Sequence, residues 1–211
     1  EALRNVGPAI TLKGAEITEA ILHCCKDIEN RSIRLPIGWV ALHTGKGRPD
    51  EATRRTMHTL APMIPPASQC PIGAVVGLCW VSRALSLEDL RVEQGCTCAC
   101  EATVDDPAAG GASGMRVLRH VSGCGLSPFA IGPFCNVISS VIRLKRPVPC
   151  KGDLGRWELP AAVRGEVLQQ LLGDPSGDGP RPQGVGWKIE THDGEVLPRR
   201  WPLPWLDPCT P

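Results

Sequence analysis

Hydrophobic and polar positions repeat with two different periods in the N-terminal part of the chain. Residues 14–25 carry apolar side chains three and four positions apart, which is typical of one face of an amphipathic helix. Residues 38–44 alternate instead, with Trp39, Ala41 and His43 on one face, and this pattern predicts a strand. The charged segment 26–34 lies between them and is expected to be extended.

The rest of the chain predicts further elements of both kinds. Asp50 precedes the segment EATRRTMHTL and is expected to cap a helix that ends before Pro62. A nearly continuous apolar run at 72–82 has the length and valine content of a buried strand. The remaining expected elements are a short capped helix at 86–90, strands at 134–146 and 155–159, and a helix at 161–172.

Two segments lack this periodicity. Residues 92–128 are rich in glycine, alanine and serine, carry closely spaced cysteines, and are expected to be an insertion loop. Residues 173–211 are rich in proline and glycine, and their one expected element is a hairpin at 187–197. The sequence therefore predicts one α+β domain at 8–172, a small β-barrel flanked by helices, with a Cys-rich insertion and an extended Pro/Gly-rich C-terminal tail.

Composition narrows the choice of partners. The 23 basic residues are balanced by 22 acidic ones, and a net charge of +1 means that nucleic acid could be bound only through a local patch. The longest mostly apolar stretch, 72–81, is far shorter than the ~20 residues that span a bilayer, so no membrane span is expected. The sequence begins at Glu1 rather than methionine, which leaves room for a cleaved targeting peptide.

The 11 cysteines point to an intracellular reducing compartment, whether cytoplasm, nucleus or organelle matrix. Cys79 and Cys135, for example, lie within apolar strand-like runs, where a free thiol packs as a small hydrophobic group. Four thiolates could hold zinc, and the candidate ligands are Cys96, Cys98, Cys100 and Cys124. The paired CxxC spacing of a zinc ribbon is absent, so free thiols are the favoured interpretation and no cofactor is expected.

The segment KDIENRS is the densest polar cluster that precedes a predicted strand. Lys26, Glu29 and Arg31, converging near the mouth of a barrel, could bind a phosphate or a base edge, or act as an acid–base set. The alternative is a surface strand of ion pairs. The GKG at 45–47 lacks the upstream glycine and the following Ser/Thr of a phosphate-binding loop, which excludes a nucleoside-triphosphatase of that type.

These segments together resemble the ASCH family, a branch of the PUA-like superfamily of β-barrels. Lys26, Glu29 and Arg31 match the charged positions of the family motif, and the stretch 38–43 matches its next strand. The later blocks IGAVVGLCWVSRALSLEDL and GPFCNVISSVIRLKRPVPCKGDLGRWELP resemble the central and closing strands. The resemblance covers about 8–172 without the insertion. It implies a PUA-like fold with a cleft between barrel and helix that binds RNA, and some members are amidohydrolases of acylated cytidine or nucleases.

The chain also departs from the family pattern. The amidohydrolase type has a Thr three positions after the Lys and a distant acidic residue; here Glu29 replaces the Thr, and Glu88 or Asp89 is the distant candidate. Lys26 and Glu29 are therefore the catalytic candidates of an activity that we do not favour. Two cleft aromatics of the family are also replaced, one of them by Ile33.

Three functions follow from this comparison. The leading one is a non-catalytic module that binds RNA, and its expected contact residues are Lys26, Glu29, Arg31, Arg34, His43, Lys46 and Arg48. The second is a structural subunit of a larger assembly, such as an organellar ribonucleoprotein, with protein partners on 92–128 and 174–211. The third is an amidohydrolase or nuclease of the ASCH type.

Overall fold

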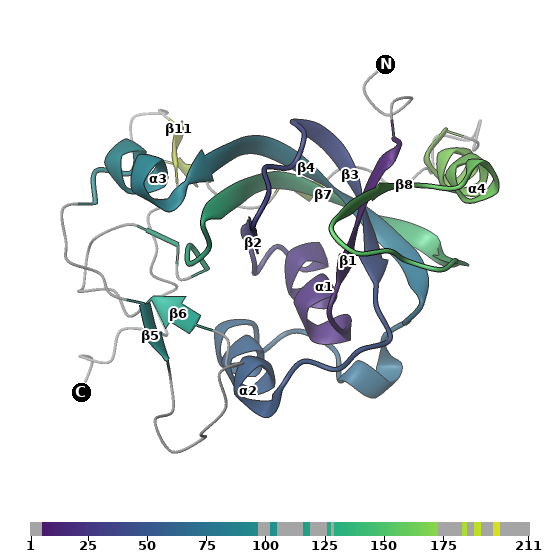
Figure 1. The fold of residues 1–211 in the computed structure, drawn as a ribbon, viewed down its shortest axis with the longest axis horizontal. Coiled ribbons are helices and arrows are strands. Elements are labelled where there is room, and N and C mark those ends of the chain that lie inside the picture. Colours follow the sequence, from purple (N-terminus) through teal and green to yellow (C-terminus); the bar gives the residue numbers. More distant parts are fainter. Residues whose placement is uncertain are drawn as a thin grey trace.

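One curled sheet organises the chain, and helices lie inside its curve and at its two ends (Figure 1). The structure, a computed structural model, describes residues 6–96, 102–104, 116–118, 126–127, 129–172, 183–184, 188–190 and 196–198. All statements about the architecture concern these residues.

The sheet contains strands from both halves of the chain. In spatial order they are β2 (Ile28–Arg31), β7 (Phe134–Pro149), β4 (Ala74–Ser86), β3 (Gly38–Thr44), β1 (Pro8–Leu12) and β8 (Arg156–Glu158), and β9 (Gln183–Gly184) pairs with β7. Only the β1–β3 pair in this sheet is parallel. Register shifts along β4 mark bulges, which bend a sheet and increase its twist. The expected α+β class and barrel-like sheet are confirmed.

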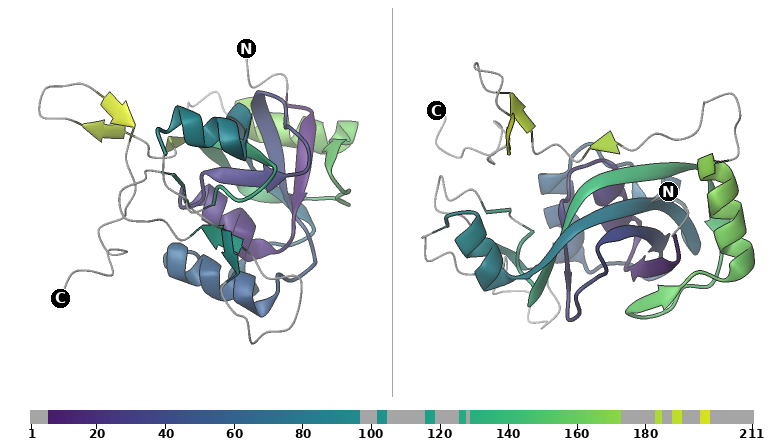
Figure 2. Two further views of the ribbon diagram at one scale, coloured as in Figure 1. Left: turned by 60° about the vertical axis from the view of Figure 1, so that its left-hand side comes forward. Right: turned by 90° about the horizontal axis from the view of Figure 1, so that it is seen from above.

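Each helix covers a different part of this sheet. Helix α1 (Ala15–Leu22) lies in the curve of the sheet and contacts β1, β3, β4 and β7 (Figure 1). Helix α2 (Glu51–Leu60) packs beside α1, and a short 3₁₀ turn, η2 (Ala67–Gln69), follows it. Helix α3 (Leu87–Glu93) continues from the end of β4, and α4 (Ala161–Leu172) packs against β7 at the opposite end of the molecule (Figure 2).

Local sequence explains where these helices begin. The Asp50 carboxylate accepts a hydrogen bond from the Thr53 N–H at 2.8 Å, and Ser86 caps α3 in the same way through the Asp89 N–H at 3.0 Å. Helix α1 ends at Leu22, and Cys24, just beyond the cap residue His23, adopts a left-handed conformation (φ 59°) of the kind that glycine usually supplies after a helix. The predicted helices at 14–25, 51–60, 86–90 and 161–172 are all present, within a few residues at their ends.

Apolar side chains fill the space on both faces of the sheet. Ile21 and Leu22 of α1 pack with Ile10 and Leu42 inside the curve, and Val167 of α4 packs with Ala41 on the other face. Two buried carboxylates also anchor α1: Glu16 lies 3.3 Å from Arg54 of α2, and Glu19 lies 2.6 Å from Arg143 of β7. The position of α1 is therefore fixed by apolar packing and by charge pairing with two neighbours.

Two sequence-based expectations need correction. Strand β1 was not predicted, because it is short and the polar residue Thr11 interrupts its apolar pattern. Its pairing with β3 is parallel and so leaves no hairpin signal. The expected insertion is also too wide, because Leu126 and Ser127 are buried in the core and α3 extends to Glu93. Leu126 and Ser127 contact core residues that are far away in sequence, and the hydrophobic period of a segment does not predict such contacts.

The remaining strands belong to the segments that lack periodicity. Within the expected insertion, β5 (Ala102–Val104) pairs with β6 (Arg116–Leu118). In the region of the expected hairpin, β10 (Lys188–Glu190) pairs antiparallel with β11 (Val196–Pro198). The connections between these strands lie outside the described residues. No helix in the described part of the chain has the length and apolarity needed to cross a membrane.

Candidate nucleic-acid interface

Two cationic side chains from the KDIENRS segment converge on one carboxylate. Lys26 Nζ lies 2.7 Å from Glu29 Oε2, and Arg31 Nε lies 3.1 Å from Glu29 Oε1. Lys26 also donates to the carbonyl of Ile28, and Arg31 Nη2 donates to the carbonyl of Thr11 at 2.9 Å. We call Lys26, Glu29 and Arg31 the ion-pair cluster; the structure brings them together, but bonds them to each other and to the backbone.

Two members of the ion-pair cluster are buried, and Arg31 is partly buried. Lys26 and Glu29 are 4% and 7% exposed, and the Lys26 ammonium lies 5.7 Å from the centre of the Phe129 ring. Burial opposes ionisation of the Glu29 carboxyl, but the two neighbouring cations outweigh it and hold its pKa below the ordinary value. The cluster is therefore an internal charge network whose polar atoms are largely used within the protein.

A second buried carboxylate lies next to the cluster. Asp27 Oδ1 accepts a hydrogen bond from the Ser127 hydroxyl at 2.7 Å, whereas Asp27 Oδ2 is buried without a hydrogen-bond partner in the described part of the structure. Burial raises the pKa of Asp27 to about 6, although Ser127 and Lys26 act in the opposite direction. Sequence reasoning missed this residue, because Ser127 is 100 positions away in sequence.

Asn30 connects β2 to the segment 129–132, which precedes β7. Its amide donates to the Phe129 carbonyl at 2.6 Å, and its carbonyl oxygen accepts from the N–H groups of Ile131 and Gly132. Asn136 of β7 connects the Glu29 carbonyl to the Leu35 N–H in a similar way. Strand β2 thus carries a polar network that orders the loops around the ion-pair cluster.

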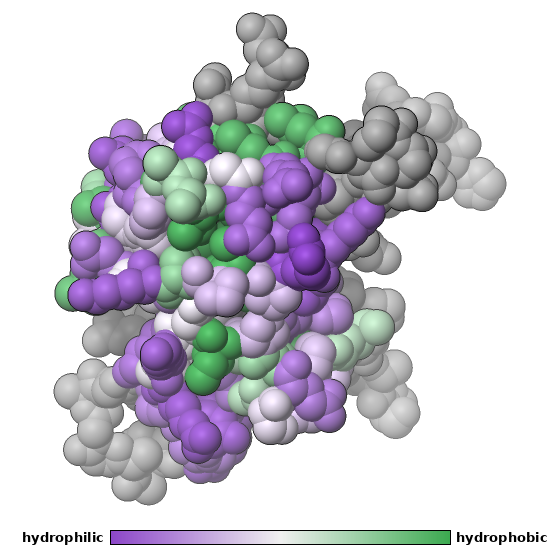
Figure 3. All heavy atoms as spheres, turned by 90° about the vertical axis from the view of Figure 1, so that its right-hand side faces the viewer, coloured by the Kyte–Doolittle hydropathy of each residue, from purple (hydrophilic) through white to green (hydrophobic). Residues whose placement is uncertain are grey.

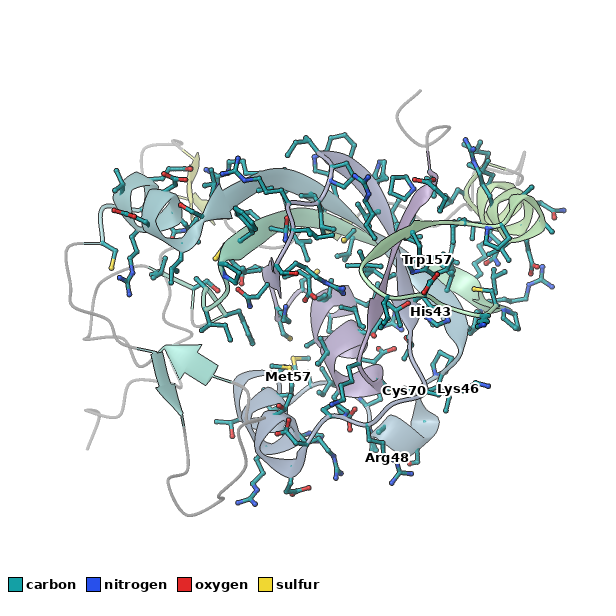
Figure 4. All side chains as sticks on the ribbon, viewed as in Figure 1. His43, Lys46, Arg48, Met57, Cys70 and Trp157 are labelled. Carbon is teal, nitrogen blue, oxygen red and sulfur yellow. The ribbon has the colours of Figure 1, made fainter. Side chains whose placement is uncertain are left out.

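The other predicted contact residues lie in different places. Arg34 is exposed at the N-terminal end of β7, where its guanidinium lies 5.0 Å from the centre of the Phe134 ring. Lys46 and Arg48 are exposed in the loop after β3. His43 is only 3% exposed. In Figure 4, His43 lies beside Trp157, Lys46 points outward, and Arg48 lies farther down. The seven predicted residues therefore do not form one continuous surface.

A pocket of about 750 Å³ opens near Lys46. Its walls are Thr11 and His43 of the sheet and three loop segments, at 45–46, at 73 and at 149–154. We call it the loop pocket. Its lining is mostly apolar, and its volume lies within the range of small-molecule sites, about 300–1,000 Å³.

The side of the molecule over α4 and β8 is mostly hydrophilic, with small hydrophobic areas between the polar side chains (Figure 3).

His43 forms the inner wall of the loop pocket. Its Nε2 donates to the Cys150 carbonyl at 3.2 Å, and its ring meets the Trp157 ring edge to face at 5.8 Å. Trp157 in turn donates to the Thr11 hydroxyl at 3.2 Å. Burial lowers the pKa of His43, so the ring is neutral near pH 7, and its Nδ1 is buried without a partner among the described residues.

Two lysines stand at the mouth of the loop pocket. Lys46 and Lys151 are exposed, and neither forms an ion pair with another described residue. The stem of Lys46 crosses Gly73, where an added Cβ would lie 3.0 Å from Lys46 Cε. Sequence reasoning missed Lys151, although the cation and glycine of PVPCKGD, placed directly after a proline-bounded strand, are a signal for an anion-binding loop.

The lysines and the apolar lining give the loop pocket features of a binding site for an anion. Unpaired lysines attract anions, and an apolar pocket accepts a flat ring. The Cys150 thiol of the pocket has its pKa raised by burial, which disfavours the reactive thiolate. In the described part of the chain, no group of three or more His, Cys, Asp and Glu side chains is placed to hold a metal ion. Of the candidate zinc ligands, Cys96 packs against the core, and Cys98, Cys100 and Cys124 lie outside the described residues.

Six cysteines in the described ranges are free thiols: Cys24, Cys25, Cys70, Cys79, Cys135 and Cys150. Comparison with known proteins adds no assignment to this geometry. No protein-family model matches the chain, and no curated protein is significantly similar to it in sequence.

Proposed function

We propose that this chain binds single-stranded RNA through the loop pocket, without catalysis, as a divergent ASCH-type domain of the PUA-like superfamily. The observation that carries the proposal is the pocket itself, an open and mostly apolar pocket of about 750 Å³ lined by the exposed lysines Lys46 and Lys151, which form no ion pair with any described residue. Lysines that lack protein partners bind phosphates, and an unstacked base needs an apolar surface. Four motifs in the family order, on a curled sheet that encloses α1, support the family assignment.

The ion-pair cluster has a supporting role in this proposal. Arg31 donates to the carbonyl of Thr11, and the side chain of Thr11 lines the loop pocket. The cluster therefore holds β1 in place behind the pocket rather than contacting RNA. The Lys26 ammonium is bonded to Glu29 and Ile28, which argues against a nucleophilic or general-base role and so against the amidohydrolase alternative.

Removing both lysines is the direct test. We expect the variant with Lys46→Ala and Lys151→Ala to bind a uridine decamer roughly tenfold or more weakly than the original chain. Each substitution removes a charged hydrogen bond to a phosphate. The slope of log K against log salt is expected to fall in magnitude by about 1–2, since each phosphate contact on a single strand contributes about 0.7. Fluorescence anisotropy at several salt concentrations measures both quantities.

The control changes the net charge equally at a distance from the pocket. Arg55 of α2 and Arg83 of β4 have exposed side chains, paired with Glu51 and Glu93. We expect the variant with Arg55→Ala and Arg83→Ala to keep the RNA affinity within about twofold, because distant exposed charges are screened. Equal losses in the two variants would mean that binding follows bulk charge, and the loop pocket would not be the site.

The structural-subunit alternative is favoured by one observation. The ion-pair cluster, which the family resemblance assigns to the ligand cleft, is bonded internally, and its Lys26 and Glu29 are buried. A chain that keeps its fold but shows no salt-dependent affinity for RNA would favour this second function over the first.

A further inference from the structure

The loop pocket contains a negative charge that phosphate binding does not explain. Asp153 is exposed in the loop that also carries Lys151, and both residues line the pocket. A carboxylate in the same pocket as two lysines weakens the attraction of the pocket for phosphate, because the carboxylate and the phosphate are both negatively charged. For a site that served only to hold the backbone of a nucleic acid, a neutral residue would be a better choice.

Asp153 has a local role that uses only half of its carboxylate. Its Oδ1 accepts a hydrogen bond from the Leu154 N–H at 2.7 Å, which orders the loop. Its Oδ2 makes no hydrogen bond or ion pair within the described part of the chain. An asparagine could make the same loop contact through its carbonyl oxygen, so loop geometry alone does not require the charge.

A carboxylate oxygen recognises hydroxyl and amino groups, because it only accepts hydrogen bonds. Next to a phosphate held by lysines, the nearest hydroxyl of a nucleic acid is the 2′-hydroxyl of ribose, which distinguishes RNA from DNA. We propose that Asp153 accepts a hydrogen bond from the 2′-hydroxyl of the nucleotide whose phosphate lies at Lys46 and Lys151. This inference rests on the proposed function and makes Asp153 its specificity-determining residue.

Three decamers of identical length and base separate the contributions of the sugar. The uridine decamer offers the 2′-hydroxyl, the deoxyuridine decamer lacks it, and the 2′-fluoro decamer keeps an RNA-like sugar shape but cannot donate a hydrogen bond. We expect the full chain to bind the uridine decamer about tenfold more tightly than the other two, the size of one hydrogen bond to a charged group. Equal affinity for the uridine and 2′-fluoro decamers would overturn the inference, because shape alone would then account for the preference.

The Asp153→Asn variant tests the residue itself. It keeps an acceptor for the Leu154 N–H and removes the charged acceptor, so the preference for RNA over DNA is expected to fall from about tenfold to about twofold or less. Affinity for the deoxyuridine decamer is expected to stay the same or rise, since the repulsion of phosphate is gone. A loss of structure in the loop would instead weaken binding of all three decamers together.

The matched control is Glu51→Gln, which removes an exposed carboxylate on α2 and is expected to leave the tenfold preference unchanged. A preference that survives Asp153→Asn would contradict the assignment of Asp153. Tight binding of RNA and DNA alike by the original chain would refute the sugar contact while leaving the proposed function intact. No binding of any decamer would refute the proposed function itself.

Discussion

Replacing Glu29 by alanine is expected to lower the free energy of unfolding by about 3–5 kcal/mol, the largest effect of any single substitution that we consider. The carboxylate is the shared partner of Lys26 at 2.7 Å and of Arg31 at 3.1 Å. Without it, the ammonium of Lys26, which is 4% exposed, stays buried without its counter-charge. Urea denaturation followed by circular dichroism measures the change.

Two further variants test whether the lost stability comes from leaving a buried charge unpaired. Glu51→Ala removes an exposed carboxylate that also pairs with two arginines, Arg54 and Arg55, and is expected to cost less than about 1 kcal/mol. Combining Lys26→Met with Glu29→Gln removes the charges of this buried pair together and is expected to restore much of the lost stability. If Glu29→Ala cost no more than Glu51→Ala, the ion-pair cluster would be solvated, and our description of it as an internal network would be wrong.

Replacing Gly152 by alanine is expected to destabilise the protein by about 1–3 kcal/mol and to weaken RNA binding at the same time. An added Cβ would lie 2.4 Å from two atoms of the His43 ring and 2.5 Å from the Thr11 hydroxyl. The His43 ring cannot move freely, because it is buried, bonded to Cys150 and packed on Trp157. The loop at 149–154 must therefore shift, and Lys151 and Asp153 shift with it.

Gly165 provides the matched control for this substitution. It lies on α4, is exposed, and an added Cβ there would meet no atom within 4 Å. Gly165→Ala is expected to stabilise the protein by about 0.5–1 kcal/mol, since alanine favours a helix over glycine, and to leave RNA affinity unchanged. Thermal unfolding and fluorescence anisotropy measure the pair. A Gly152→Ala protein with unchanged stability and affinity would show that the loop does not depend on its close approach to His43.

Much of the secondary structure follows from short-range signals. Asp50 and Ser86 each lie one residue before a helix and cap it as their residue types predict. The strand at 38–44 was predicted with its observed bounds from its alternating pattern, and in the structure both of its faces pack in the core, Leu42 on one side and Ala41 on the other. Strand β1 escaped prediction, since its parallel pairing with β3 depends on residues about thirty positions away.

The candidate site, too, could be predicted only in part from the sequence. The sequence offered a convergence of Lys26, Glu29 and Arg31 as one of two interpretations, beside a surface strand of ion pairs, and the structure brings the three side chains together. Their burial could not be predicted, because Leu126, Ser127 and Phe129 pack over this region and come from about a hundred residues farther along the chain. The loop pocket depends on three separate loops, and only their arrangement in space brings Lys46 and Lys151 to one cavity.

Hydrogen–deuterium exchange with and without the uridine decamer tests the central claim most directly. Binding in the loop pocket is expected to slow amide exchange in the loops at 44–48, 71–74 and 149–154, and to leave exchange around Arg34 and α3 unchanged. Arg34 and the pocket lie at opposite ends of β7, so the two regions are resolved on separate peptides. Protection confined to the Arg34 end of β7, with none at 149–154, would contradict the assignment of the loop pocket as the RNA site.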